Sequence, residues 1–253
     1  GTHDRGVVRY EGDEFKSYSR RDGLAGDGVY SICEDPNGHI YLGNNQGLTR
    51  YDGRSFEALE LEKPGRFLWG SCVDREGDIW FGLERSPDSP AAACRWDGRR
   101  LHWHGLGDQV SEVGHSIHQI VQDAAGVLWF GGDGLFSIGD GGSVAVELSQ
   151  RVGTVFNLLP HSDGTLWVCG EHGLFSLRDG ELVDMTPERE IGFVAMTESE
   201  RGKVLLTTYD GRLVEWDGAE LSAVLQADAT FWRGLCLDRV GRLWMGTYGK
   251  GLY

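Results

Sequence analysis

The sequence predicts an all-β protein in which a short unit of strands is repeated along the chain. Glycine is abundant and proline is scarce, with 39 and 6 residues among 253, and nine tryptophans stand in short apolar runs. Short apolar runs separated by glycine turns favour strands joined by tight hairpins. A repeat of about forty residues completes the pattern, because four-stranded units of that length are typical of β-propeller blades.

The first repeated phrase reads Asp-x-x-Gly-x, then an apolar residue and usually Trp. It predicts one strand before the phrase, a turn in which glycine takes a positive φ, and a second strand after it. Successive glycines lie 38 or 39 residues apart, except for one gap of 49 that contains the insertion ERSPDSPAAA at residues 84–93. The six copies are DPNGHIY at 35, DREGDIW at 74, DAAGVLW at 123, HSDGTLW at 161, SERGKVL at 199 and DRVGRLW at 238.

One position on each second strand holds a large apolar residue, which we expect in the core between neighbouring blades. These residues are Tyr41, Trp80, Trp129, Trp167, Leu205 and Trp244. The second repeated phrase centres on a Gly preceded in most copies by Asp, and it predicts the hairpin between the third and fourth strands. Its copies are YEGDEF at 10, YDGRSF at 51, WDGRRL at 96, GDGGSV at 139, RDGELV at 178 and WDGAEL at 216.

These units predict a six-bladed β-propeller of four-stranded antiparallel blades in a single domain, 1–253. Five blades are contiguous, and the sixth is a composite of strands from both ends of the chain, which would close the ring and remove exposed sheet edges. The expected blades are 24–60, 65–104, 113–148, 152–186, 191–225, and 229–253 together with 1–19. Both ends supply a third strand, so we expect one copy to be displaced, frayed or the result of cutting a longer repeat array.

Charge and hydropathy narrow the range of partners. A net charge of −15 argues against nucleic acid, whose binding usually relies on clustered Lys and Arg. No run approaches the roughly eighteen apolar residues that a membrane span requires, so we expect no direct membrane insertion by this segment and a soluble chain. The remaining partners are a small molecule or another protein.

Cysteine and histidine positions give little support to a metal site. Cys33, Cys72 and Cys236 share one repeat position before the turn, where we expect small core residues. There is no C-x-x-C pair, and we predict no metal and no cofactor. The alternative metal cluster that the spacing allows consists of His102, His104, His115 and His118.

Acidic residues are mostly assigned to turns. The Asp residues that open the first phrase are expected to accept backbone hydrogen bonds from their own turn. We therefore predict no catalytic residue, and the weak candidates for acid–base chemistry are Glu171 and His172 in a loop between the second and third strands.

The entrance of the first strand gives the stronger hypothesis for a site. Five residues before each turn acid, the repeats carry Tyr30, Trp69, His118, Phe156, Val194 and Arg233. Because first strands line a propeller channel, this set predicts a mostly aromatic collar at one mouth, suited to a ligand. The predicted ligand-binding residues are Tyr30, Trp69, His118, Phe156, Trp232 and Arg233. The alternative is that these side chains only plug the channel.

Loops between second and third strands are expected on the same face as the collar. They contribute a mixed set of amides, acids, aromatics and cations, a composition that suits a carbohydrate or another small polar ligand. The set is Asn44, Asn45, Glu84, Arg85, Asp133, Glu171, His172, Tyr209, Asp210, Tyr248 and Lys250.

The stretch GVYSICEDPNGHIYLGNNQGLTRYDGRSFEAL, and the phrases DREGDIWFG, DAAGVLWFGGDGLF and DGTLWVCGEHGLF, resemble the repeat of the two-component regulator propellers. That family forms the extracytoplasmic sensor region of many bacterial hybrid histidine kinases. The resemblance implies a signal-transduction module in the periplasm or outside the cell, as part of a longer membrane-anchored sensor. It implies no catalytic motif.

A weaker likeness is to the streptogramin lyases, whose chemistry depends on His and Glu residues near the channel mouth. The function expected first is therefore a non-enzymatic recognition propeller that binds a small molecule, such as a carbohydrate, or a protein at the channel mouth. The alternatives are a propeller-fold lyase or hydrolase that uses rim His and Glu residues, and a protein–protein interaction scaffold.

Overall fold

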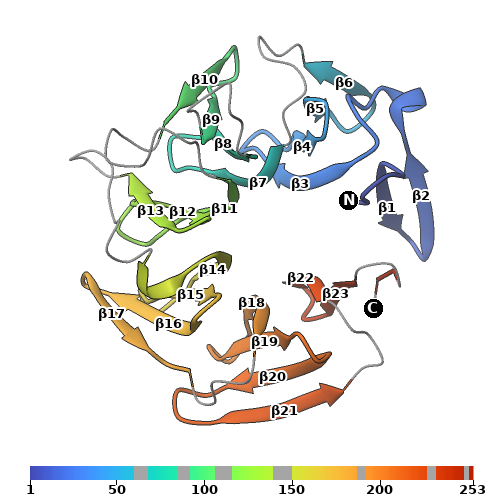
Figure 1. Cartoon of the computed structure of the whole chain (residues 1–253). Coiled ribbons are helices and arrows are strands. Elements are labelled where there is room, and N and C mark those ends of the chain that lie inside the picture. Colours follow the sequence, from blue (N-terminus) through green and yellow to red (C-terminus); the bar gives the residue numbers. More distant parts are fainter. Residues whose placement is uncertain are drawn as a thin grey trace. The chain divides into compact units, whose positions relative to one another are not determined.

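The computed structural model describes residues 1–59, 68–84, 92–105, 116–138, 150–186, 192–226, 232–247 and 251–252. Among the described residues, the regular secondary structure is almost entirely antiparallel β-strand, and the predicted all-β class is confirmed (Figure 1). A 3-10 turn, η1 (Arg20–Asp22), precedes the first large sheet. In the described ranges, no helix has the length and apolar character needed to cross a bilayer.

Four sheets have the predicted four strands, in which each strand pairs with the next along the chain. The first comprises β3 (Val29–Glu34), β4 (Ile40–Asn44), β5 (Leu48–Tyr51) and β6 (Phe56–Leu59). The second comprises β7 (Leu68–Val73), β8 (Ile79–Leu83), β9 (Ala93–Trp96) and β10 (Leu101–His104). The third comprises β14 (Val155–Pro160), β15 (Leu166–Gly170), β16 (Gly173–Arg178) and β17 (Glu181–Asp184). The fourth comprises β18 (Phe193–Glu198), β19 (Val204–Thr208), β20 (Arg212–Trp216) and β21 (Leu221–Gln226).

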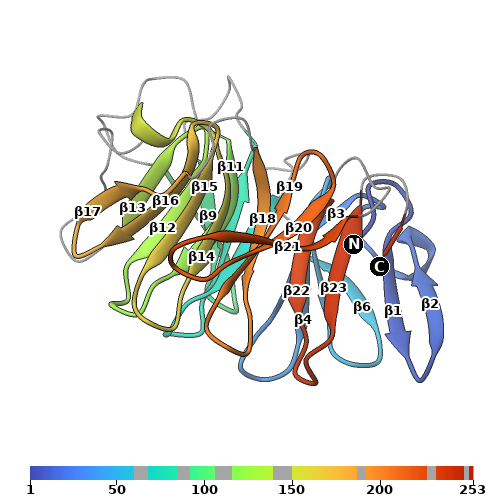
Figure 2. The same cartoon turned by 90° about the horizontal axis from the view of Figure 1, so that it is seen from below.

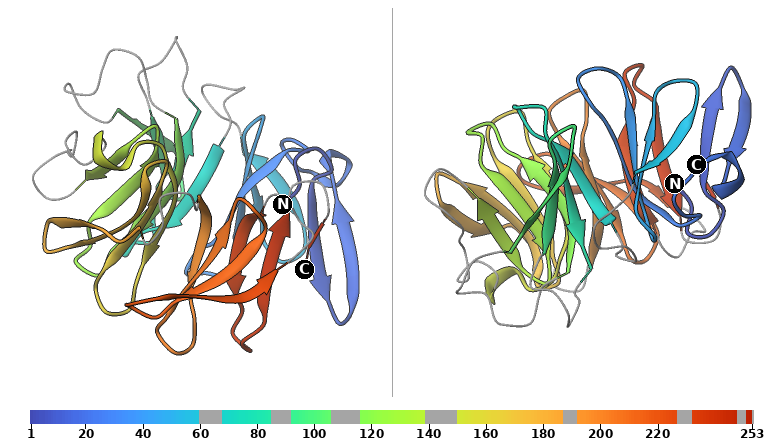
Figure 3. Two further views of the ribbon diagram at one scale, coloured as in Figure 1. Left: turned by 60° about the horizontal axis from the view of Figure 1, so that its bottom comes forward. Right: turned by 90° about the horizontal axis from the view of Figure 1, so that it is seen from above.

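Three sheets are smaller among the described residues. One has the three strands β11 (Ile117–Gln122), β12 (Leu128–Gly132) and β13 (Leu135–Ile138). The chain ends form two further sheets, the blue hairpin of β1 (Val7–Glu11) and β2 (Glu14–Tyr18) in Figure 3, and the red pair of β22 (Trp232–Leu237) and β23 (Leu243–Thr247) in Figure 2. In the part of the chain that the structure describes, the C-terminal copy of the third strand is represented by a bridge between Gly246 and Leu252.

The Asp-x-x-Gly turns have the predicted geometry. In the second sheet, Asp74 Oδ1 accepts the backbone N–H groups of Glu76 and Asp78 at 3.1 and 2.9 Å, and Gly77 N donates to Asp74 O at 3.0 Å. The turns at Asp35, Asp123 and Asp238 repeat these bonds. All six turn glycines have a φ between 69° and 90°, as expected.

The turn acid also explains why Trp follows three residues after the glycine. Trp80 Nε1 donates to Asp74 Oδ2 at 2.8 Å, and Trp244 Nε1 donates to Asp238 Oδ2 at 2.9 Å. A buried indole N–H needs such an acceptor. Where His161 replaces the acid, the buried Trp167 Nε1 has no hydrogen-bond partner among the described residues.

The chain divides into two compact units, and the first contains Gly1–Gln122, Leu128–Gly132 and Ser137–Val144. Its main core lies between the β3–β6 and β7–β10 sheets, where Tyr41 and Leu48 pack with Ile79 and Phe81. A second cluster joins Val7 of β1 to Val29 and Leu42 of the β3–β6 sheet. The β1–β2 hairpin is thereby fixed against the first sheet.

The second unit contains Asp123–Val127, Asp133–Phe136 and Ala145–Tyr253. Its core joins Trp167 and Leu174 of one sheet to Phe193 and Trp216 of the next. The second-strand residues Tyr41, Trp80, Trp167 and Leu205 are buried as predicted, whereas Trp129 and Trp244 are only half-buried.

The prediction that Cys236 is a core residue is wrong. Cys236 is exposed, while Cys33 and Cys72 are half-buried. Cys236 lies opposite Trp244 in the β22–β23 pair, a sheet with two described strands, and its side chain stays exposed. Burial raises the pKa of the Cys33 thiol to about 12, so it stays protonated and behaves as a small apolar group.

Candidate functional site

A β-bulge recurs at each collar position. The ladder between the first two strands of every repeat changes register there, for example between Val29 and Ser31 of β3 and between Ile117 and Gln119 of β11. The skipped residues in these two strands are the collar residues Tyr30 and His118. A bulge re-aims the side chain of the unpaired residue, and bulges often stand beside functional sites.

In the first unit the bulged residues form a continuous row of aromatic rings. The ring centroids of Tyr30 and Trp69 are 4.7 Å apart, and those of Trp69 and His118 are 5.7 Å apart. His3 extends the row, with its ring edge-to-face against Tyr30 at 5.9 Å. We call His3, Tyr30, Trp69 and His118 the aromatic row. Three of the four residues were predicted from the sequence; His3 was not.

Gly70 allows β7 and β11 to approach closely enough for this row. A Cβ built on Gly70 would lie 2.5 Å from Gln119 Cα, a separation that real side chains do not reach. The glycine therefore brings the backbone that carries Trp69 directly against the backbone that carries His118.

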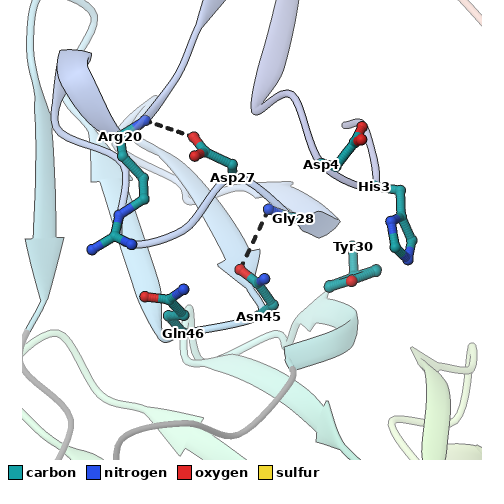
Figure 4. A pocket seen from close by; sticks show the side chains of 8 residues that line it. All are labelled: His3, Asp4, Arg20, Asp27, Gly28, Tyr30, Asn45 and Gln46. Carbon is teal, nitrogen blue, oxygen red and sulfur yellow. Dashed lines mark hydrogen bonds between the residues drawn. The ribbon is translucent and has the colours of Figure 1, made fainter.

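A pocket of about 380 Å³ adjoins the row at Tyr30 (Figure 4). Polar and charged groups line it, from the N-terminal segment, the segment before β3 and the β4–β5 loop. The lining residues are His3, Asp4, Arg20, Asp27, Gly28, Tyr30, Asn45 and Gln46. Tyr30 and Asn45 were expected on one face of the fold, and both line this pocket.

Hydrogen bonds fix the floor of the pocket. Gly28 N donates to Asn45 Oδ1 at 3.3 Å, and Asn45 N donates to Gly28 O at 3.0 Å. A Cβ on Gly28 would lie 2.8 Å from the carbonyl oxygen of His3 and 3.0 Å from the Tyr30 hydroxyl. Glycine at this position therefore leaves room for the His3 carbonyl oxygen and the Tyr30 hydroxyl.

Tyr30 keeps its phenolic proton at neutral pH. Burial raises its pKa, and the nearby Glu84 carboxylate raises it further. The hydroxyl can therefore donate a hydrogen bond as well as accept one.

In the second unit the described collar is smaller. Phe156 of β14 meets Tyr209 of the β19–β20 turn edge-to-face, with ring centroids 6.0 Å apart. Trp232 and Arg233 lie on β22, but their side chains fall outside the described residues. The loop residues Arg85, Tyr248 and Lys250 fall outside them as well.

Glu171 and His172 anchor a turn in the structure. Glu171 Oε2 accepts from Thr154 Oγ1 at 3.1 Å, and His172 Nδ1 lies 3.1 Å from the backbone oxygen of Arg151. Each side chain thus binds the segment before β14, and both are solvent-exposed.

The histidines of the alternative metal cluster have separate neighbours. His102 Nε2 lies 2.7 Å from Asp97 Oδ2, and the His104 ring packs on Trp80 at 4.7 Å. His118 belongs to the aromatic row, and His115 lies outside the described residues. Within the described ranges, no three His, Cys, Asp or Glu side chains are arranged to hold a metal ion.

Comparison with known proteins supports the resemblance in the sequence. Two segments of this chain, residues 23–46 and 227–249, match the family model described as two component regulator propeller. The match covers β3 and β4 at one end and β22 and β23 at the other, so the predicted repeat is confirmed in both. A comparison with curated protein sequences gave no match.

Solved structures share the fold at low sequence identity. A catalytically inactive virginiamycin B lyase from Staphylococcus aureus, solved with quinupristin, has a TM-score of 0.75 at 15% identity, over 94% of this chain and 83% of the lyase. PorZ, a surface component of the type-IX secretion system of Porphyromonas gingivalis, has a TM-score of 0.73 at 15% identity. The likeness covers 97% of this chain and 42% of PorZ.

A third similar structure is an extracellular domain. The extracellular domain of BT4673 from B. thetaiotaomicron, assigned to a one component or hybrid two component system, has a TM-score of 0.58 at 16% identity, over 88% of this chain and 38% of that one. These likenesses establish the propeller-type fold, and they carry no residue-level function.

Proposed function

We propose that this chain is a non-enzymatic recognition module of a bacterial sensor, which binds a small molecule, such as a carbohydrate, or a protein through the aromatic row. The observation that carries the proposal is the set of ring contacts from His3 to His118, placed beside a pocket of mixed polarity. Aromatic faces with a few polar groups suit sugars and other small polar ligands.

The family match and the extracellular neighbours support a sensing role outside the cytoplasm. The proposal therefore includes a position in the periplasm or outside the cell, as part of a longer membrane-anchored protein. Phe156, Trp232 and Arg233 are proposed as further ligand contacts.

The proposal also includes one six-bladed ring, 1–253, closed by pairing the N-terminal hairpin with the C-terminal strands. Pairing would cover the open edges that β1 and β23 otherwise present. Deletion of residues 1–19 should then lower the hydrogen-exchange protection of the β22 and β23 amides. Unchanged protection would contradict ring closure.

Ligand binding can be tested with a panel of mono- and disaccharides and polar metabolites. A binder should raise the midpoint of thermal unfolding, and Trp69→Ala should weaken its affinity about ten-fold or more, since a buried aromatic contact contributes about 1.5 kcal/mol or more. Phe15→Ala, at a ring that is 63% exposed on β2, is the matched control and should leave affinity unchanged. Equal affinity of wild type and Trp69→Ala would contradict the site.

The enzymatic alternative has its own test. If a lyase or hydrolase activity is found, Glu171→Gln and His172→Ala should abolish it. The bond from Thr154 to Glu171 and the contact of His172 with the backbone oxygen of Arg151 instead favour a structural role, and unchanged turnover would eliminate this pair.

A further inference from the structure

The pocket beside the aromatic row carries charges of both signs at separate places. In Figure 4 the Arg20 guanidinium lies near Gln46 on one side, whereas Asp4 and His3 lie on the other, next to Tyr30. Gly28 and Asn45 lie between the two sides, and Asp27, on the Arg20 side, accepts the backbone N–H of Arg20. A pocket with the Arg20 guanidinium on one side and the Asp4 carboxylate on the other is complementary to a ligand whose own charges are apart.

The cationic end is available for a ligand. Arg20 is exposed, and within the described ranges its guanidinium has no hydrogen bond or ion pair. Its backbone is held in place, because Arg20 N donates to Asp27 Oδ1 at 2.8 Å and η1 is closed by the Ser19–Asp22 capping box. A guanidinium binds a carboxylate through two parallel hydrogen bonds.

The anionic end is equally accessible. Asp4 lies 4.0 Å from Arg5 Nε, but both side chains are at least 75% exposed, so that contact contributes little. His3 is its neighbour in the chain, and the His3 ring stands edge-to-face against the Tyr30 ring. An ammonium group there would gain both the carboxylate of Asp4 and the face of an aromatic ring.

The size of the pocket suits a small ligand. Its 380 Å³ is near the lower end of ligand pockets, which begin at about 300 Å³. An anion would face two carboxylates, and a simple cation would face Arg20. We propose that the pocket binds a small zwitterion of the amino-acid type, with its carboxylate at Arg20 and its ammonium group at Asp4, His3 and Tyr30. This inference rests on the proposed recognition function, because Tyr30 belongs to both.

The test uses isothermal titration calorimetry with β-alanine, 4-aminobutyrate and 6-aminohexanoate, which differ in the distance between their charges. Their matched one-ended analogues are the unsubstituted carboxylic acids and alkylamines of equal length. At least one zwitterion should bind about ten-fold more tightly than both of its analogues, since each charge-assisted contact is worth roughly that factor.

Two variants test which end of the pocket binds which charge of the ligand. Arg20→Ala should reduce the best zwitterion to the affinity of the alkylamine, and Asp4→Asn should reduce it to that of the carboxylic acid. Arg21→Ala removes a neighbouring exposed arginine that does not line the pocket, and it should leave binding unchanged. The inference is overturned if no zwitterion exceeds its analogues, or if Arg20→Ala binds as wild type does.

The two proposals can fail separately. If another ligand binds and responds to Trp69→Ala while every zwitterion fails, the zwitterion inference is wrong and the recognition function stands. If the zwitterions bind with Arg20 dependence but Trp69→Ala has no effect on any ligand, the pocket is supported and the aromatic row is not.

Discussion

Asp74 links a turn to the core through a single carboxylate. One carboxylate oxygen accepts two backbone N–H groups, and the other accepts the indole N–H of Trp80. Asp74 is only 8% exposed, so these bonds are made in the protein interior. In Asp74→Asn the amide must turn an N–H toward one of these donors. We therefore expect the free energy of unfolding, measured with urea, to fall by about 2 kcal/mol. Asp217→Asn, at an exposed turn with two backbone bonds, should cost about 0.5 kcal/mol or less. An equal loss in both variants would contradict the role of the indole bond.

His104 should make stability depend on pH near neutrality. Burial lowers its pKa below the usual 6.5, and the charges of Arg95 and His102 lower it further. Because the folded-state pKa is depressed, the stabilising contribution is present above pH 6.5 and is lost as the pH falls through the folded value. His104→Phe keeps the ring against Trp80 and removes a buried Nε2 that has no partner among the described residues. The variant should lose less stability than wild type between pH 7.5 and 5 in urea unfolding; equal losses would contradict this.

At the scale of the element, each repeat depends on one glycine conformation. Gly164 has a φ of 88°, and a Cβ built there would meet nothing within 4 Å, so any cost of substitution is conformational. Gly164→Ala should lower the free energy of unfolding by about 1–2 kcal/mol. Gly164→Asn should lower it by less, because asparagine tolerates a positive φ better than alanine does. Gly234→Ala is the control, since its surroundings are equally open and its φ is not positive. Equal stabilities of Gly164→Ala, Gly164→Asn and wild type in urea unfolding would contradict this.

The elements were predictable because their determinants are local. Turn glycines and turn acids act within five residues, so their spacing revealed the strands. The bulges at Tyr30 and His118 were not predicted as bulges, because a change of register depends on pairing between strands. His3 was missed for a similar reason. Its place beside Tyr30 depends on the bond from Val29 N to Thr2 O, 2.8 Å long, which joins the N-terminal segment to β3.

At the scale of the whole molecule, the proposed closed ring predicts one cooperative unfolding transition. Each compact unit has its own core, around Phe81 in the first and Phe193 in the second. If the units fold as one domain, tryptophan fluorescence and far-UV circular dichroism should give coincident urea transitions. The slowest amides of β8 and β19 should then exchange with the same opening free energy. Two separate transitions, or different opening free energies in β8 and β19, would show two domains in place of one ring.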